Sequence, residues 1–168
     1  TNSIASGENS IGIGYAANAT ALNGTAVGNG SNATGDSASG FGYGANAYGA
    51  SSVSLGASSE SANDYAMALG ANATANFDYS VAIGAGGVST SRAYQIALGT
   101  TDNTYTLAGV SSGGSTDAQD GTLYMVTTDS SGNLATTDFV VDTNTQLDIT
   151  GSGTESIALG TNSIASGG

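Results

Sequence analysis

Val81-Ala82-Ile83-Gly84 and Ile96-Ala97-Leu98-Gly99 are two copies of the unit that decides the fold. Each copy has a large apolar residue, a small residue, a second large apolar residue and then Gly. Alternation of large and small side chains over three or four residues is typical of a β-strand, whose side chains point to opposite faces in turn. A Gly directly after the strand suits a turn that needs positive φ or passes close to other backbone. We therefore expect each copy to form a short strand followed by a turn.

The unit recurs every fourteen residues along the first hundred positions. Gly fills nine of the twelve multiples of seven from 7 to 84, although the chain holds only 27 Gly among 168 residues. The second apolar position of each unit is taken by Ile13, Val27, Phe41, Leu55, Leu69, Ile83 and Leu98. The Gly that follows is Gly14, Gly28, Gly42, Gly56, Gly70, Gly84 or Gly99, the last being displaced by a one-residue insertion. A fixed short period of this kind indicates a solenoid.

Each coil of this solenoid is predicted to hold one strong strand and one weaker strand, the weaker ones lying at 18–20, 32–35 and 46–49. A coiled coil is excluded because most heptads carry a Gly, and each Gly costs a helix interior about 1 kcal/mol relative to Ala. Equivalent residues should stack from coil to coil about 4.8 Å apart. We expect the second apolar residues to fill a thin interior, each one coil above the last. Tyr65, Tyr79 and Tyr94 should form a further ladder.

The small residues between the apolar pairs have two explanations. They are Gly12, Ala26, Gly40, Ser54, Ala68, Ala82 and Ala97. One explanation is that a narrow, crowded roll needs small side chains there. The other is close approach by another chain, since outward positions of a one-sided strand would normally be polar. We expect the second, with these residues packing against neighbouring chains of a parallel trimer.

Composition excludes several classes of function. The net charge is −12, and Arg92 is the only basic residue, so the surface repels nucleic acid and anionic membrane. The chain has no His, Cys or Lys, so the usual catalytic bases, nucleophiles and transition-metal ligands are missing. We expect no catalytic residue, no metal, no cofactor and no membrane contact by these residues.

Several residues would suit other chemistry, but their patterns are weak. Carboxylate pairs at Asp117/Asp120 and Asp138/Asp142 would suit glycoside hydrolysis or calcium, but the interpretation we prefer is solvated loop charge. Thr20 and Thr34 do not continue into the row that ice binding requires. Four Asn residues begin N-x-T triplets, which we interpret as structural positions at turns rather than glycosylation sites: Asn18, Asn23, Asn32 and Asn72.

The fourteen-residue repeat stops at residue 99 and resumes at residue 154, so the chain has three parts. Residues 1–99 are predicted to form the roll, and residues 154–168 to start a second one. Between them, 100–153 is non-repetitive, holds seven of the thirteen acidic residues and is predicted to be a small all-β insert. Its expected strands are 104–110, 122–128, 133–141 and 145–150, rich in β-branched and aromatic residues, with a hairpin turn at 129–133. Residues 161–167 repeat residues 1–7 without a change, which suggests that the module recurs in tandem in the parent protein.

These repeats resemble the head of the trimeric autotransporter adhesins, the YadA-like family. The family's repeat is approximately N-S-h-A-h-G-x-x-A-x-A-x-G, with h apolar, and 9–14, 80–84 and 156–160 match it. The resemblance implies an all-β fold, a left-handed parallel β-roll with three rolls side by side in a homotrimer. Family members project from the outer membrane of Gram-negative bacteria and bind host matrix or other surfaces. No neck motif, heptad stalk or membrane-anchor strand is present in these residues, so an anchor would lie outside them.

The resemblance implies an extracellular, non-enzymatic adhesin head on a bacterial cell surface, active in virulence or biofilm formation. Its partners would be a host matrix protein, a glycan or an abiotic surface. The alternative is a phage tail-fibre or tail-spike segment that binds a receptor glycan. The ligand and its binding residues cannot be deduced from stacked coils. We favour the insert as the binding surface because functional variation usually lies in loops held by a rigid scaffold. The alternative is that the insert only widens or redirects the fibre.

Overall fold

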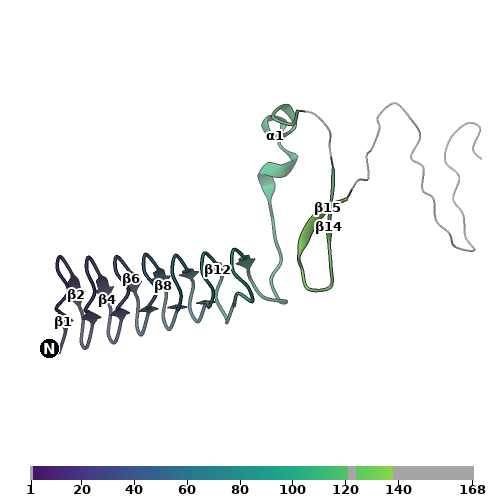
Figure 1. Cartoon of the computed structure of the whole chain (residues 1–168). Coiled ribbons are helices and arrows are strands. Elements are labelled where there is room, and N and C mark those ends of the chain that lie inside the picture. The colour runs from purple at the N-terminus through teal and green to yellow at the C-terminus, as the bar shows by residue number, and fades with distance from the viewer. Residues whose placement is uncertain (1, 121–123, 138–168) are drawn as a thin grey trace, which may run out of the picture. The chain divides into compact units, whose positions relative to one another are not determined.

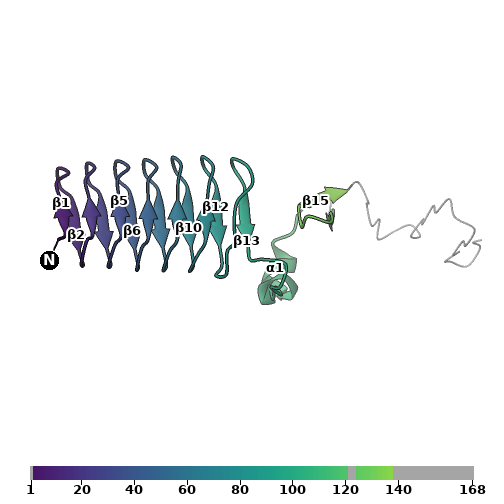
Figure 2. The same cartoon turned by 90° about the horizontal axis from the view of Figure 1, so that it is seen from below.

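The computed structural model describes residues 2–120 and 124–137. The chain divides into two compact units, Thr1–Tyr105 and Thr106–Gly168. The first unit is a parallel β-solenoid in which one coil stacks on the next (Figure 1). The view turned by 90° shows the strands of successive coils aligned along the solenoid (Figure 2). The predicted roll is therefore confirmed.

Two sheets form the walls of the solenoid, and each coil contributes a strand to both. One sheet has six strands: β1 (Ile4–Ala5), β3 (Asn18–Ala19), β5 (Asn32–Ala33), β7 (Asn46–Ala47), β9 (Glu60–Ser61) and β11 (Thr74–Ala75). The other has seven: β2 (Ile11–Ile13), β4 (Thr25–Val27), β6 (Ser39–Phe41), β8 (Val53–Leu55), β10 (Met67–Leu69), β12 (Val81–Ile83) and β13 (Ile96–Leu98). All neighbouring strands pair in parallel.

The register repeats the sequence period. Met67 pairs with Val53 and with Val81, each fourteen residues away. In the last coil Val81 pairs with Ile96, fifteen residues away, so the inserted residue is absorbed outside the strands. The predicted weaker strands are confirmed as β3, β5 and β7.

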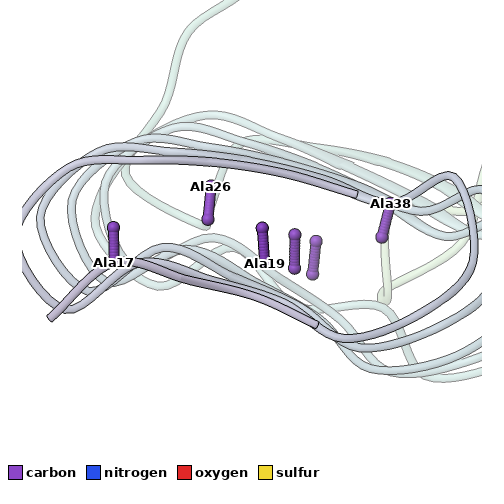
Figure 3. Packing of buried hydrophobic residues seen from close by; sticks show 6 residues of the cluster. Ala17, Ala19, Ala26 and Ala38 are labelled. Atoms are coloured by element: carbon purple, nitrogen blue, oxygen red, sulfur yellow. The ribbon is translucent and has the colours of Figure 1, made fainter. Parts of the chain in front are cut away.

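The interior of the roll contains small side chains almost exclusively. Figure 3 shows Ala17, Ala19, Ala26 and Ala38 between the two walls of the coil, and all four are fully buried. The space is narrow: a methyl group added to Gly40 would lie 2.8 Å from the carbonyl oxygen of Asn32 on the opposite wall. Because the walls stand this close, only Gly, Ala and Ser fit along most of the roll.

The prediction of which side chains point into the interior is therefore wrong. The residues at the second apolar position of each repeat do not fill the core but point outward. The following side chains are partly or largely exposed: Ile13, Val27, Phe41, Leu55, Leu69, Ile83 and Leu98. The small residues between the apolar pairs, predicted to contact other chains, face the interior instead. Five of them are buried: Ala26, Gly40, Ser54, Ala68 and Ala82. Gly12 and Ala97, in the two outermost strands of the sheet, are partly buried.

A serine layer divides the interior into two alanine clusters. One cluster includes Ala26 and Ala33 in the first coils, and the other includes Ala68 and Ala82 in the later coils. The coil between them buries four hydroxyl side chains completely: Ser52, Ser54, Ser59 and Ser61. The Oγ of Ser54 donates to the carbonyl oxygen of Asn46 at 2.6 Å and lies 3.0 Å from the Oγ of Ser61. Hydrogen bonds of this kind offset the cost of burying hydroxyl groups.

The seven turn glycines predicted after the strands all have positive φ, between 67° and 139°. Gly56 shows why no larger residue replaces them. Its φ is 139°, and an added Cβ would lie 2.6 Å from the carbonyl oxygen of Gly70 in the next coil. Both the conformation and the close backbone approach therefore require Gly.

The described part of the second unit is only partly β. The hairpin of β14 (Met125–Thr128) and β15 (Leu134–Thr137) confirms two predicted strands and the turn at 129–133. The strand predicted at 104–110 is wrong, because it ends in a 3₁₀-helix, η1 (Ala108–Ser111). A short helix, α1 (Gly113–Asp117), follows it, and the side chain of Ser112 accepts a hydrogen bond from the backbone of Ser115 at its start.

Two predictions in this region have no structural counterpart to compare. The strand at 145–150 and the second roll at 154–168 lie outside the described residues. In the part of the chain that is described, no helix has the length and apolar character needed to cross a membrane.

Candidate interaction surface

The outer side of the seven-stranded sheet, called the apolar face below, carries two columns of mostly apolar side chains. Its first column consists of Ile11, Thr25, Ser39, Val53, Met67, Val81 and Ile96, and its second of the seven predicted core residues. Exposure is large for such residues: Leu55 is 52 % exposed and Ile83 is 38 % exposed. Soluble monomers rarely expose contiguous apolar patches of more than a few hundred Å². A face that runs the whole length of the roll is therefore a candidate interface with other chains.

The six-stranded sheet presents a different outer side. Its central column holds Asn18, Asn32, Asn46 and Glu60, all polar. The side-chain amide of Asn32 donates to the Oδ1 of Asn46 at 2.7 Å, and that of Asn18 donates to the Oδ1 of Asn32 at 3.4 Å. This ladder links three successive coils through their side-chain amides. The roll is thus two-sided, with one apolar and one polar outer wall.

An aromatic ladder borders the apolar face in the last three coils. The rings of Tyr65 and Tyr79 stack with centroids 4.7 Å apart, and those of Tyr79 and Tyr94 with centroids 5.0 Å apart. This confirms the predicted ladder. Each Tyr has φ between 56° and 59°, so the left-handed backbone of the turn aims the rings along a common line. Tyr94 is 76 % exposed, which leaves the end of the ladder open to solvent.

The middle ring of the ladder, Tyr79, lies near negatively charged carboxylates. Partial burial raises the pKa of Tyr79, and the neighbouring phenols of Tyr65 and Tyr94 raise it further. The carboxylates of Asp78 and Asp64 add to the same shift, because negative charge opposes the formation of a phenolate.

The raised pKa predicts a pH dependence of stability. Above the ordinary tyrosine pKa of about 10, the unfolded chain loses the Tyr79 proton more readily than the folded chain does. Stability is therefore present below that pH and is lost as pH rises through the folded pKa. Thermal unfolding followed between about pH 9 and pH 11 should show a steeper loss for the parent than for Tyr79→Phe. Equal slopes would show that Tyr79 does not carry the effect.

The chemical candidates from the sequence do not converge on a site. Asp117 ends α1, and both it and Asp120 are exposed, while Asp138 and Asp142 lie outside the described residues. No cluster of three or more acidic residues that could hold a metal ion is found in the described ranges.

The Asn residues of the N-x-T triplets occupy structural positions. Asn18 and Asn32 belong to the amide ladder of the six-stranded sheet. Asn23 and Asn72 lie at turns with φ of 56° and 59°, a region that Asn tolerates better than most residues. Asn23 and Asn72 fit the predicted position at turns, whereas the prediction is wrong for Asn18 and Asn32, which lie in strands β3 and β5.

The apolar face was not predicted as a site, because its larger residues were expected in the interior. A usable signal was present. The inward positions of the second wall, at 19, 33, 47, 61 and 75, are also only Ala or Ser. Two rows that never admit a large side chain indicate a closed, narrow interior between them.

Comparison with models of known protein families identifies the repeats of the roll. A model of the YadA head domain repeat, in two copies, matches residues 5–31, 33–59, 62–86 and 152–168, more than half of the chain. The matched stretches cover most of the roll and also the segment that follows the insert. No curated protein matches the chain.

Proposed function

Because the chain belongs to the YadA head domain repeat family, we propose that it is the extracellular head segment of a trimeric bacterial surface adhesin. The family implies a location on the bacterial cell surface. Anchoring in the outer membrane would be supplied by parts of the protein other than these residues. The role is attachment and not catalysis, and its targets are a host matrix protein, a glycan or an abiotic surface.

The apolar face is the observation that carries this proposal. Three rolls set parallel around one axis would each turn this face toward the other two. Fully burying a Leu or Ile side chain stabilises a structure by about 1.5 to 3 kcal/mol, and Leu55 and Ile83 already lie about half-way to burial. Repeated over seven strands, such contributions exceed the cost of bringing three chains together. The polar outer wall, with its Asn ladder, would remain in water.

Attachment is tested by separating the roll from the insert. Tyr105 closes the first unit: its hydroxyl donates to the carbonyl oxygen of Leu98, and nearby the backbone N–H of Thr100 donates to the Oδ1 of Asn103 at 2.6 Å. A replacement that starts after Tyr105, exchanging 106–150 for a short Gly-Ser link, therefore preserves the end of the roll.

The full chain and this variant are compared on glycan and matrix-protein arrays. We expect the full chain to bind and the variant to keep its oligomeric mass but lose binding, because the insert is non-repetitive and holds seven of the thirteen acidic residues. Binding by both would assign attachment to the roll. Absence of binding by the full chain to every array and to abiotic surfaces would contradict the adhesive role.

A further inference from the structure

The aromatic ladder places three phenol rings in a fixed row along the last three coils of the roll. The ring planes of Tyr65 and Tyr79 are within 8° of parallel, and those of Tyr79 and Tyr94 within 2°. The N–H of Tyr79 donates to the carbonyl of Asp64 at 3.0 Å, and the N–H of Tyr94 makes the equivalent bond to Asp78 at 3.2 Å. These bonds hold the turns in register, so that the ring carbons ortho to one hydroxyl lie beside those of the next ring.

All three rings are accessible to a small oxidant. The exposed fractions of Tyr65, Tyr79 and Tyr94 are 53 %, 47 % and 76 %. The middle ring, Tyr79, also lies near the carboxylates of Asp64 and Asp78. Negative charge close to a ring favours the removal of an electron from it, because the positive charge that is left behind is attracted to the carboxylates. A ring that is oxidised in this row therefore has a second oxidisable ring stacked against it.

Two other tyrosines are equally exposed but have no stacked neighbour at the equivalent position of the adjacent coil. Tyr15 is 60 % exposed and Tyr43 is 68 % exposed. The N–H of Gly30 donates to the carbonyl of Tyr15 at 2.9 Å, and the N–H of Gly44 donates to that of Asn29 at 2.8 Å. Asn29 therefore occupies the coil between the two tyrosines, which are two coils apart. This pair has the exposure of the ladder without its ring contact.

We propose that the aromatic ladder is an oxidative cross-linking site, at which Tyr79 couples to Tyr65 or to Tyr94 and forms dityrosine between adjacent coils. The oxidant is hydrogen peroxide, acting through a peroxidase. It takes one electron and the hydroxyl proton from each of two neighbouring phenols and is reduced to two molecules of water. The two phenoxyl radicals then join by a carbon–carbon bond between their ortho carbons. The hydrogen of each ortho carbon moves as a proton to the ring oxygen, so both hydroxyls re-form and the product has lost two hydrogen atoms.

The cross-link would brace the roll covalently. The chain has no Cys, so no disulfide can join its coils. In the chain-entropy account, a covalent bond between two coils restricts the unfolded chain in the same way as a disulfide does. The cross-linked roll should therefore unfold at a higher temperature than the untreated roll. This inference does not depend on the adhesive role.

The test treats the full chain at micromolar concentration with a peroxidase and hydrogen peroxide. Chains that run as monomers on a denaturing gel are digested, and mass spectrometry identifies the cross-linked peptides. We expect peptides that join Tyr79 to Tyr65 or to Tyr94, each with the loss of two hydrogen atoms. Dityrosine fluorescence of the same chains measures the yield. Circular dichroism should show a higher melting temperature for the cross-linked chain than for the untreated chain.

Two matched variants make the result specific. Tyr79→Phe keeps a ring in the stack but removes the central phenol. It should reduce the yield within single chains about fivefold or more, because the two remaining phenols are two coils apart and lose the advantage of proximity. Tyr15→Phe combined with Tyr43→Phe removes two exposed tyrosines outside the stack and should leave that yield unchanged.

Three results would overturn the proposal. They are the absence of the expected peptides, a yield that Tyr79→Phe leaves unchanged, and a yield that falls with the loss of Tyr15 and Tyr43. An unchanged melting temperature after cross-linking would overturn the bracing role.

Discussion

Ala68→Leu should unfold the roll or reduce its free energy of unfolding by about 3 kcal/mol or more. Ala68 is fully buried in the later alanine cluster, between Ser54 and Ala82 of the adjacent coils. Overpacking a core costs about 1 to 3 kcal/mol, and more where the structure cannot relax. Relaxation is restricted here, because the opposite wall is backbone bonded to its own neighbours above and below. Thermal unfolding followed by circular dichroism measures the effect.

The matched control lies one residue away in the same strand. Met67→Leu changes an outward side chain to one of similar volume and should leave the melting temperature nearly unchanged. If Ala68→Leu melted like the parent while Met67→Leu was destabilised, the inward and outward assignments would be reversed.

Leu55→Asp combined with Leu69→Asp should dissociate the trimer without unfolding the roll. Both residues belong to the second column of the apolar face, and their side chains are not buried in the single chain. In the proposed trimer, six carboxylates would be brought together near one axis, away from water. Uncompensated burial of charge costs several kcal/mol per group, which exceeds what the remaining contacts contribute. Light scattering at micromolar concentration should return the mass of one chain, 16.1 kDa.

Thr34→Asp, combined with Thr20→Asp, provides the control for charge alone. Both threonines are exposed and follow strands of the polar six-stranded sheet. This pair adds the same charge to the opposite wall and should leave the trimer intact. Loss of the β signal in the Leu variant, or dissociation of the Thr variant, would show that the apolar face is not the interface.

The sequence was sufficient to predict the spacing of the strands, but not which face of each strand points into the interior. The fourteen-residue repeat correctly predicted the strands, their register and the turn glycines, because a parallel solenoid repeats its backbone geometry in each coil. Alternation of large and small residues, as at Val81, Ala82 and Ile83, shows that the two faces of a strand differ. It does not show which of the two faces is inside. Which face is inside depends on the distance between the walls, which tight turns keep so short that the inward positions of the seven-stranded sheet hold only Gly, Ala and Ser. That distance is a property of the closed coil and not of any one strand.

The insert shows the opposite failure, where propensity was followed without a repeat to support it. The β-branched and aromatic residues at 104–110 predicted a strand, yet none of the described strands pairs with this segment, and a 3₁₀-helix forms at its end. Gly113 and Gly114 begin α1, a helix that was not predicted, and the side chain of Ser112 caps its first turn. The hairpin of β14 and β15 was predicted correctly because its Gly-containing turn and its two flanking strands agree with one another.

The native mass of the full chain tests most directly whether the apolar face is covered by other chains. Light scattering coupled to size-exclusion chromatography at micromolar concentration should return three times the 16.1 kDa of one chain. A mass of 16.1 kDa at that concentration, with the β signal of the roll intact, would contradict the account, because a stable monomer would leave the apolar face in water.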